Sequence, residues 1–476
     1  MKSLIFTLFC VVATSFNLSS QVDIDFEVEG YNSDTLLLAY YFADKILITD
    51  TLYSEGGSNK FNFSSDTLLP HGMYLAVSPS GDYYYQLLVD GDDQEFYVNI
   101  NNERERPILF EGSDENLMFY EYMHFLTVSR EQIAKADLAL STTDSTMVSI
   151  ADQLEQDKKN INKLVEDRQQ EILTDHPNSV TSLLLKSNVP FEFPEFTGTP
   201  EELELKKYRY YKDRYFDQLD MSHPAVLRTP VLDQRISYYI DNLTPSAPDS
   251  IIQSLDVILG LLEDNEDAFQ YYLSNFLNDY GNSKYIGMDA VYVHLALEYY
   301  DKGKATWVEE ENLKEIVGNA KKLKPTLIGR PAPDFTVKSK DGTEYTLDSF
   351  NKDFTILVFW KPDCSHCTKA MPHIIDFAEK YKELSVDVLT ICTKTGKDYG
   401  KCWEGVEEKG MLELLNTGDE FHRSRIFSKY YVNSTPAIYI LDNEKKIKLK
   451  KVPAENLDAV MQQLMEIDAA EGSDVH

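Results

Sequence analysis

Apolar and polar residues alternate along the first part of the chain. Residues 22–29 read Val-Asp-Ile-Asp-Phe-Glu-Val-Glu, and this period of two predicts a strand with one buried face. The tripeptide Asp-Thr-Leu recurs at residues 34, 50 and 66. This regular spacing fits hairpin-sized units of a small barrel or sandwich, unless it is a coincidence in a region rich in Thr and Leu. We therefore expect an all-β domain over residues 22–112.

The pattern changes to a helical period after residue 112. Apolar residues between Ser141 and Asp175 recur with a period near 3.6, which predicts one amphipathic helix. Further helices are predicted near residues 199–218, 229–243, 248–263, 265–280, 287–300 and 306–322. The many aromatic residues of this region favour packing between helices, with a peptide-binding or self-association surface as the alternative. We expect an all-α accessory domain over residues 113–325.

Strands and helices alternate from residue 326 onward. A hairpin is expected around Asp341 and Gly342, and the apolar run 354–360 predicts a buried strand. The elements predicted after it are a helix at 364–382, a strand at 386–391, a helix at 401–409, a helical stretch at 421–430, strands at 437–441 and 446–452, and a helix at 455–467. A strand, a helix and a second strand imply a parallel, right-handed crossover. This order predicts an α/β domain over residues 326–470, the third of a multidomain protein.

The first 20 residues have the pattern of a signal peptide. Lys2 precedes an apolar core from Leu4 to Ala13, and a cleavage site is expected after Ser20. This core is shorter than the ~20 residues that span a bilayer, and no other segment is long and apolar enough. Cys10 lies inside the core without the usual small residue before it, which argues against lipid attachment. We expect an exported, periplasmic protein without a transmembrane segment; association with the outer membrane is the alternative.

The chain is strongly acidic, with 46 Lys and Arg against 79 Asp and Glu in 476 residues, a net charge of −33. This charge argues against nucleic acid as a partner, because the phosphates of nucleic acid need a basic surface. Most of the negative charge lies before Thr326. It predicts a well-solvated surface, or else a surface that repels other proteins or selects basic ones.

The strongest chemical signal is the motif Cys364-Ser-His-Cys367, which follows the strand 354–360 and opens a helix. Free N–H groups and the helix dipole at such a position favour a thiolate. Cys364, nearest the helix start, is expected to be the attacking thiol, and Cys367, one turn later, the resolving thiol. His366 either stabilises the thiolate or is simply a polar residue of the first turn.

Other chemistry at these residues is less well supported. A zinc site of both cysteines and His373 lacks a fourth ligand unless His366 or Cys392 supplies it, so no metal and no cofactor is expected. Cys392 and Cys402 lie ten residues apart. The simpler interpretation is two small buried or free thiols; the alternative is an auxiliary disulfide or a relay to the first pair.

The stretch from Phe359 and Trp360 to Cys367, together with Pro372 and the later Ser434-Thr-Pro436, resembles the periplasmic TlpA-like disulfide oxidoreductases. The resemblance covers the C-terminal domain and implies a thioredoxin fold, in which Thr435–Pro436 is a cis peptide that faces the cysteines. It implies that Thr435 and Pro436 bind substrate, Thr435 offering its backbone to a peptide as an added strand. Trp360 and His366 would tune the dithiol. The helical and β-rich parts resemble accessory and N-terminal domains of multidomain Bacteroidota proteins of this kind.

Two departures from thioredoxin itself affect the expected chemistry. Val358 stands where thioredoxin has a buried aspartate, so the proton acceptor for Cys367 is unassigned. The motif interior is Ser-His rather than Gly-Pro, which leaves the direction of electron flow open.

The function expected is therefore an exported thiol-disulfide oxidoreductase, and first of all a reductase, that exchanges disulfides with protein substrates through Cys364 and Cys367. It would need a membrane electron donor of the thiol-shuttle type. One alternative is an oxidase or isomerase on the same fold. Another is a non-enzymatic assembly or binding protein whose dithiol is residual.

Overall fold

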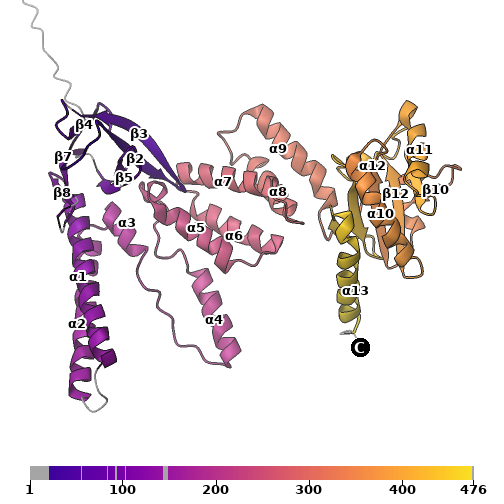
Figure 1. Cartoon of the computed structure of the whole chain (residues 1–476). Coiled ribbons are helices and arrows are strands. Elements are labelled where there is room, and N and C mark those ends of the chain that lie inside the picture. The colour runs from indigo at the N-terminus through magenta and orange to yellow at the C-terminus, as the bar shows by residue number, and fades with distance from the viewer. Residues whose placement is uncertain are drawn as a thin grey trace, which may run out of the picture. The chain divides into compact units, whose positions relative to one another are not determined.

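The computed structural model describes residues 21–473 except 55, 83, 92–93, 102, 105 and 143–147, and leaves out the side chains of 148 and 469–473 (Figure 1). The chain divides into two compact units. The first joins residues up to 244 with 260–268, and the second joins 245–259 with the residues from 269 onward. The expected signal peptide, residues 1–20, lies outside the described residues. Within the described part, no helix combines the length and the apolar character needed to cross a membrane.

Two four-stranded sheets at the start of the first unit enclose one hydrophobic core, so the all-β prediction is confirmed as a sandwich. Their strand orders are β4-β1-β7-β8 and β3-β2-β5-β6. The strands are β1 (Val22–Val28), β2 (Thr35–Phe42), β3 (Lys45–Tyr53), β4 (Lys60–Ser65), β5 (Gly72–Val77), β6 (Tyr84–Val89), β7 (Gln94–Ile100) and β8 (Ile108–Glu111). In β1 the apolar residues at even positions are buried, as the alternation predicts.

The Asp-Thr-Leu copies do not mark three equivalent hairpins. The first two belong to one hairpin, where Leu36 of β2 is the cross-strand partner of Leu52 of β3. The third, at residues 66–68, follows the end of β4. The regular spacing is therefore not the period of a structural repeat.

Helices make up the rest of the first unit. They are α1 (Asp114–Thr142), α2 (Val148–Asp175), α3 (Val180–Lys186), α4 (Pro200–Asp213) and α5 (Pro230–Leu243). The single helix predicted from Ser141 is wrong at its start, because Ser141 and Thr142 end α1 and α2 begins at Val148. Tyr122 of α1 and Ile172 of α2 share a small buried cluster. Ile150 and Leu164, which belong to the same apolar period of α2, are exposed.

The remaining helices before the C-terminal domain are α6 (Pro248–Leu261), α7 (Glu266–Gly281), α8 (Asp289–Leu295) and α9 (Glu310–Leu323). A π-helical turn, Ala296–Tyr300, continues α8, so the helix predicted over 287–300 is present with a change of winding at its end. The all-α prediction for this middle region is confirmed. The domain boundaries at 112/113 and 325/326 stay predictions.

The C-terminal domain is built on a seven-stranded mixed sheet of order β10-β9-β13-β12-β11-β14-β15. Its strands are β9 (Thr336–Lys338), β10 (Glu344–Thr346), β11 (Phe354–Trp360), β12 (Val386–Cys392), β13 (Leu415–Gly418), β14 (Ala437–Leu441) and β15 (Ile447–Lys450). The central strand β11 runs parallel to β12 and antiparallel to β14, and all seven of its residues are buried. The expected parallel pair and closing hairpin are both present. Strand β13 was not predicted.

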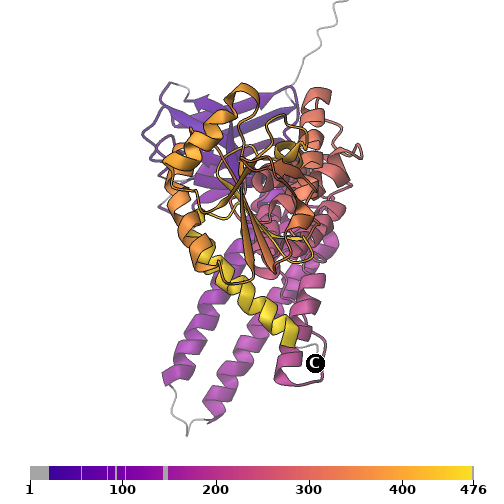
Figure 2. The ribbon, with the colours of Figure 1, turned by 90° about the vertical axis from the view of Figure 1, so that its right-hand side faces the viewer.

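Helices cover both faces of this sheet (Figure 2). They are α10 (Ser365–Lys380), α11 (Gly400–Glu408), α12 (Ile426–Lys429) and α13 (Leu457–Ser473). Ile356, Val358 and Trp360 of β11 face a core shared with α10, α11 and α13. Leu357 and Phe359 face a second core that includes residues of α12. Because successive side chains of a strand point to opposite faces, one continuous apolar run serves both cores.

Candidate active site

Cys364 is the N-cap residue of α10, at the point where the chain turns from β11 into the helix. Its backbone is extended, with φ −114° and ψ 116°, so the side chain lies over the first turn of the helix. The backbone N–H of Cys367 donates to the Sγ of Cys364 at an N···S distance of 3.3 Å. The sulfur thus takes the capping position that an oxygen of Ser or Asp usually fills. Cys364 and Cys367 are both free thiols.

The two thiols differ in burial. Cys364 is 9% exposed, while Cys367 is 0% exposed and faces the core between α10 and the sheet. Burial raises the pKa of the Cys364 thiol, but hydrogen bonds from the Cys367 side chain, the Cys367 backbone N–H and the Thr435 side chain outweigh it and lower the pKa overall. Burial above all, together with the neighbouring Cys364, raises the pKa of Cys367 to about 11. Cys364 is therefore the thiol that ionises first, while Cys367 keeps its proton to higher pH.

The loop before β14 lies beside the two cysteines. Phe359 pairs with Ala437 across β11 and β14, and this register brings the preceding loop to the end of β11 where the motif begins. The Thr435–Pro436 peptide is cis, as the resemblance implies. The thiol of Cys364 donates to the Thr435 carbonyl oxygen at 3.2 Å. The structure therefore brings Cys364, Cys367, Thr435 and Pro436 together.

The two expected tuning residues differ in exposure. The backbone N–H of His366 is among the groups that lower the pKa of Cys364, while its ring is exposed. Trp360 ends β11 fully buried, and its indole nitrogen has no hydrogen-bond partner in the described part of the structure. Val358 is buried in the same strand, so this position offers no carboxylate for the proton of Cys367.

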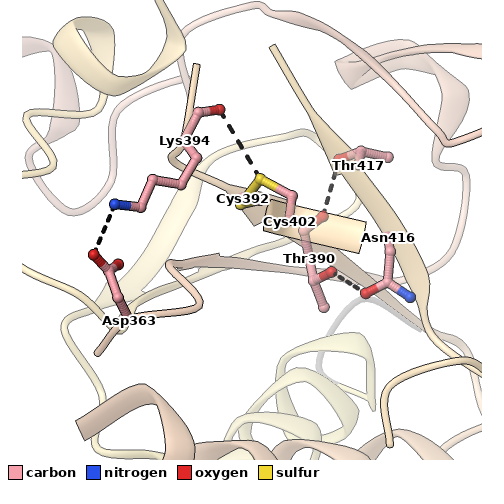
Figure 3. Close-up of a disulfide and its surroundings, with 7 residues drawn as sticks. All are labelled: Asp363, Thr390, Cys392, Lys394, Cys402, Asn416 and Thr417. Carbon is pink, nitrogen blue, oxygen red and sulfur yellow. Dashed lines mark hydrogen bonds and ion pairs between the residues drawn. A yellow bond between two sulfur atoms is a disulfide. The ribbon is translucent and has the colours of Figure 1, made fainter. Parts of the chain in front are cut away.

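A disulfide joins Cys392, at the end of β12, to Cys402 in α11 (Figure 3). The simpler expectation of two free thiols is therefore wrong. Strand pairing explains why this bridge lies close to the motif. Cys392 is the register partner of Trp360, and the N–H of Thr393 donates to the Trp360 carbonyl at 2.8 Å. Both cysteines of the bridge are 1% exposed. The bridge shares one buried cluster with Cys364 and Cys367.

Residues near this bridge contact the loop that carries Cys364. Lys394 forms an ion pair with Asp363, the residue before Cys364, at 2.8 Å (Figure 3). Gly405 of α11 lies so close to the loop that a Cβ there would meet the Cβ of Pro362 at 2.8 Å and the Trp360 ring at 3.2 Å. Sequence reasoning missed Gly405, although a glycine inside a predicted helix is a recognised signal of close packing.

A surface groove of about 750 Å³, here called the active-site groove, runs beside the motif. Its lining comes from α10, from the loop before β14 and from the segment after β15, and includes His366, Lys369, His373, Thr435, Pro436 and Lys451. His373 is exposed. Among the described residues, no three His, Cys, Asp or Glu side chains are grouped so that they could hold a metal ion.

Comparisons with known proteins agree with this geometry. The model of the AhpC/TSA family matches residues 328–450. Thiol-disulfide oxidoreductase ResA of a Bacillus cereus strain is 24% identical over 140 residues, which are 29% of this chain and 78% of that protein. The protein of the same name from Bacillus thuringiensis subsp. konkukian is 26% identical over 120 residues, 25% of this chain and 66% of that protein. The C-terminal domain is a TlpA-like thiol-disulfide oxidoreductase domain.

Solved structures also resemble the chain, and a second family model matches a different part of it. A thioredoxin-like protein from Bacteroides caccae ATCC 43185 has a TM-score of 0.42 and 18% identity, covering 58% of this chain and 97% of that chain. A domain of a possible thiol-disulfide isomerase from Cytophaga hutchinsonii ATCC 33406 has a TM-score of 0.28 and 27% identity, covering 30% of this chain and 97% of that chain. A domain of unknown function, DUF5106, matches residues 148–323, upstream of the oxidoreductase domain.

Proposed function

We propose that this oxidoreductase domain reduces disulfides in exported protein substrates, with Cys364 as the attacking sulfur and Cys367 as the resolving sulfur. The observation that carries the roles of the two sulfurs is that their pKa values shift in opposite directions. The pKa of Cys364 is lowered and that of Cys367 is raised, although the two residues share one helical turn. A thiolate is the nucleophile in disulfide exchange, so one sulfur is ready to attack while the other keeps its proton.

The reaction has two exchange steps. The thiolate of Cys364 attacks one sulfur of the substrate disulfide, the substrate S–S bond breaks, and the leaving sulfur departs as a thiolate that takes up a proton. A mixed disulfide now joins Cys364 to the substrate. Cys367 then gives up its proton and attacks the Sγ of Cys364, which releases the second substrate thiolate. Two electrons have passed from the dithiol to the substrate, and a Cys364–Cys367 disulfide remains.

Substrate binding is proposed at Thr435 and Pro436. The carbonyl of Thr435 lies 3.2 Å from the Cys364 sulfur, so a polypeptide that pairs with this backbone would bring its disulfide to the attacking atom. Regeneration of the dithiol needs two electrons from outside the chain, for which we propose a membrane donor of the thiol-shuttle type. The signal-like residues 1–20 support export to the periplasm.

The assay that tests this proposal is reduction of insulin, with dithiothreitol to regenerate the dithiol. The intact protein is expected to accelerate the reduction, and the Cys364→Ser variant to lose that acceleration completely. The Ser365→Ala variant, which changes an exposed residue between the two cysteines, is the control and is expected to stay active. Full turnover by Cys364→Ser would overturn the assignment of the attacking sulfur.

One observation favours the opposite direction as a second candidate. Hydrogen bonds that lower the pKa of Cys364 stabilise the reduced dithiol, and this raises the reduction potential. A sufficiently high potential makes the same site an oxidase or isomerase. Equilibration with a glutathione redox buffer measures the potential: a value below about −200 mV supports the reductase, and one above about −180 mV the oxidase or isomerase.

A further inference from the structure

The active-site groove continues onto the helices of the second compact unit. A second hollow, of about 430 Å³, is lined by α7, by the loop that follows it and by α9. Tyr431 and Lys451 line both hollows, so the two adjoin at these side chains. The path they form leads from His366 and Thr435, beside the reactive cysteine, to Asn278 near the end of α7.

Contacts within the unit hold the junction in place. Lys450, the last residue of β15, is 3% exposed and forms an ion pair with Asp289, the first residue of α8. The Tyr431 hydroxyl donates to Asn319 Oδ1 of α9 at 3.4 Å. Lys451 follows the buried lysine directly, and its backbone N–H donates to the Ile438 carbonyl at 2.7 Å. Both residues shared by the hollows are thus attached to structured elements.

The lining of the second hollow suits a polypeptide backbone. It contains the amide and hydroxyl side chains Ser274, Asn278, Asn282, Ser283 and Asn319, which can donate and accept hydrogen bonds. Asn278 and Asn282 are exposed. The loop between Ser283 and Asp289 exposes 80% of Tyr285. An exposed tyrosine next to a polar groove is typical of a protein-binding surface.

The charge along this path is positive, in contrast to the net charge of −33 for the chain. Lys369 and Lys451 line it without an ion-pair partner among the described residues. Among the described lining residues, Glu455 is the one carboxylate of the active-site groove, and Asp289 is the one carboxylate of the second hollow. Because Asp289 is paired with Lys450, its charge is largely neutralised within the protein. The path therefore favours a ligand with negative charge.

We propose that the α7–α9 surface is the second half of the substrate site, and that it binds an extended, acidic polypeptide segment flanking the substrate disulfide. The proposal rests on the function proposed above for Cys364 and gives a role in substrate selection to part of the DUF5106 region. Lys451 contacts the acidic segment at the junction, and the side chains of α7 and α9 bind its backbone farther along.

Synthetic disulfide peptides test this proposal. A short peptide carries one disulfide and fills only the active-site groove; three long peptides add the same ten-residue tail in acidic, neutral or basic form. We measure kcat/KM for reduction of each by the full-length protein. The acidic tail is expected to raise kcat/KM over the basic tail by about 1.4-fold to fivefold, the range expected of one exposed charge pair. Added salt should reduce this preference.

Variants separate the second half of the site from the chemistry. Lys451→Gln is expected to reduce the preference for the acidic over the basic tail. The double variant Asn278→Ala/Asn282→Ala is expected to lower kcat/KM for all three long peptides, because these amides bind the backbone. Both should change the rate with the short peptide less. Gln270→Ala, on an exposed position of α7 outside the hollow, is the matched control. The proposal would be overturned by equal rates for all tails, by an acidic preference that survives Lys451→Gln, or by long-peptide rates that the asparagine double variant leaves unchanged. Failure of the wild-type protein to reduce even the short peptide would instead contradict the proposed function.

Discussion

The backbone N–H of Cys367 points at the sulfur of Cys364, with 3.3 Å between nitrogen and Sγ. This contact makes the reactive sulfur part of the helix start, because it accepts one of the N–H groups that a helix leaves without an internal partner. The same geometry places the second sulfur one turn along α10, buried and within reach of the first. Helix capping and disulfide chemistry thus depend on the same few atoms.

The Cys367 side chain is expected to affect the ionisation of Cys364. Its hydrogen bond is the largest influence that lowers the pKa of Cys364 against the effect of burial. Cys367→Ala should therefore raise the pKa of Cys364, while Cys367→Ser, which keeps a donor, should raise it less. The pH dependence of iodoacetamide alkylation at Cys364 measures this, since only the thiolate reacts. If both variants have the alkylation profile of the wild-type protein, the Cys367 side chain does not support the thiolate.

The Thr435 hydroxyl is expected to influence both sulfurs. Its oxygen is buried and makes no hydrogen bond of regular geometry to the described residues, but it lowers the pKa of Cys364 and of Cys367. Thr435→Val keeps the shape of the side chain and removes the hydroxyl, so the pKa of each thiol should rise. The pH at which alkylation of each thiol becomes fast should therefore be higher than in the wild-type protein. Ser434→Ala, at the exposed preceding residue, is the control and should leave the profile unchanged. A Val variant with the wild-type profile would exclude the hydroxyl as a donor to these sulfurs.

Gly405 is expected to be required for the position of the active-site loop. An added methyl group would lie 2.8 Å from Pro362 and 3.2 Å from the ring of Trp360, and neither can move without displacing the residues before Cys364. Gly405→Ala should destabilise the domain by about 1–3 kcal/mol, the usual cost of overpacking, and slow insulin reduction. Gly400→Ala changes the same helix where nothing lies within 4 Å, and should leave activity intact. Equal behaviour of the two variants would contradict the close packing described here.

The Cys392–Cys402 bridge is expected to stabilise the fold. It closes a loop with a sequence separation of ten residues, for which chain entropy predicts about 2–3 kcal/mol. Urea denaturation of Cys392→Ala/Cys402→Ala should show a loss of this size. Cys364→Ala/Cys367→Ala removes two thiols that are not cross-linked and should cost less. If dithiothreitol leaves the denaturation midpoint of the wild-type protein unchanged and the bridge variant is equally stable, the bridge contributes no such stabilisation.

Much of the oxidoreductase domain could be predicted because its signals are local in sequence. The run from Phe354 to Trp360 is apolar throughout, and the cysteines follow at helical spacing. Strand β13 could not be found this way, because it has four residues and its centre is the polar pair Asn416 and Thr417. Side-chain pairing explains that composition: the Thr390 hydroxyl of β12 donates to Asn416 Oδ1 at 2.7 Å.

The parts of the site that depend on tertiary register could not be predicted. A spacing of ten residues says nothing about whether Cys392 and Cys402 meet; that depends on how α11 packs against the end of β12. The second hollow is also invisible in the sequence, because Tyr431 and Asn319 come together only in the folded unit. Thr435 was found because the resemblance gave its position, not because its residue type carries a signal.

Trapping of the mixed disulfide tests the central claim most directly. Cys367→Ser is incubated with insulin, and mass spectrometry identifies the cysteine that carries the insulin chain. The account predicts a stable adduct on Cys364, because the sulfur that would release it is gone. It also predicts no adduct when Cys364→Ser is treated in the same way. An adduct on Cys367 in the second variant, or none on Cys364 in the first, would contradict the assignment of Cys364 as the attacking thiolate.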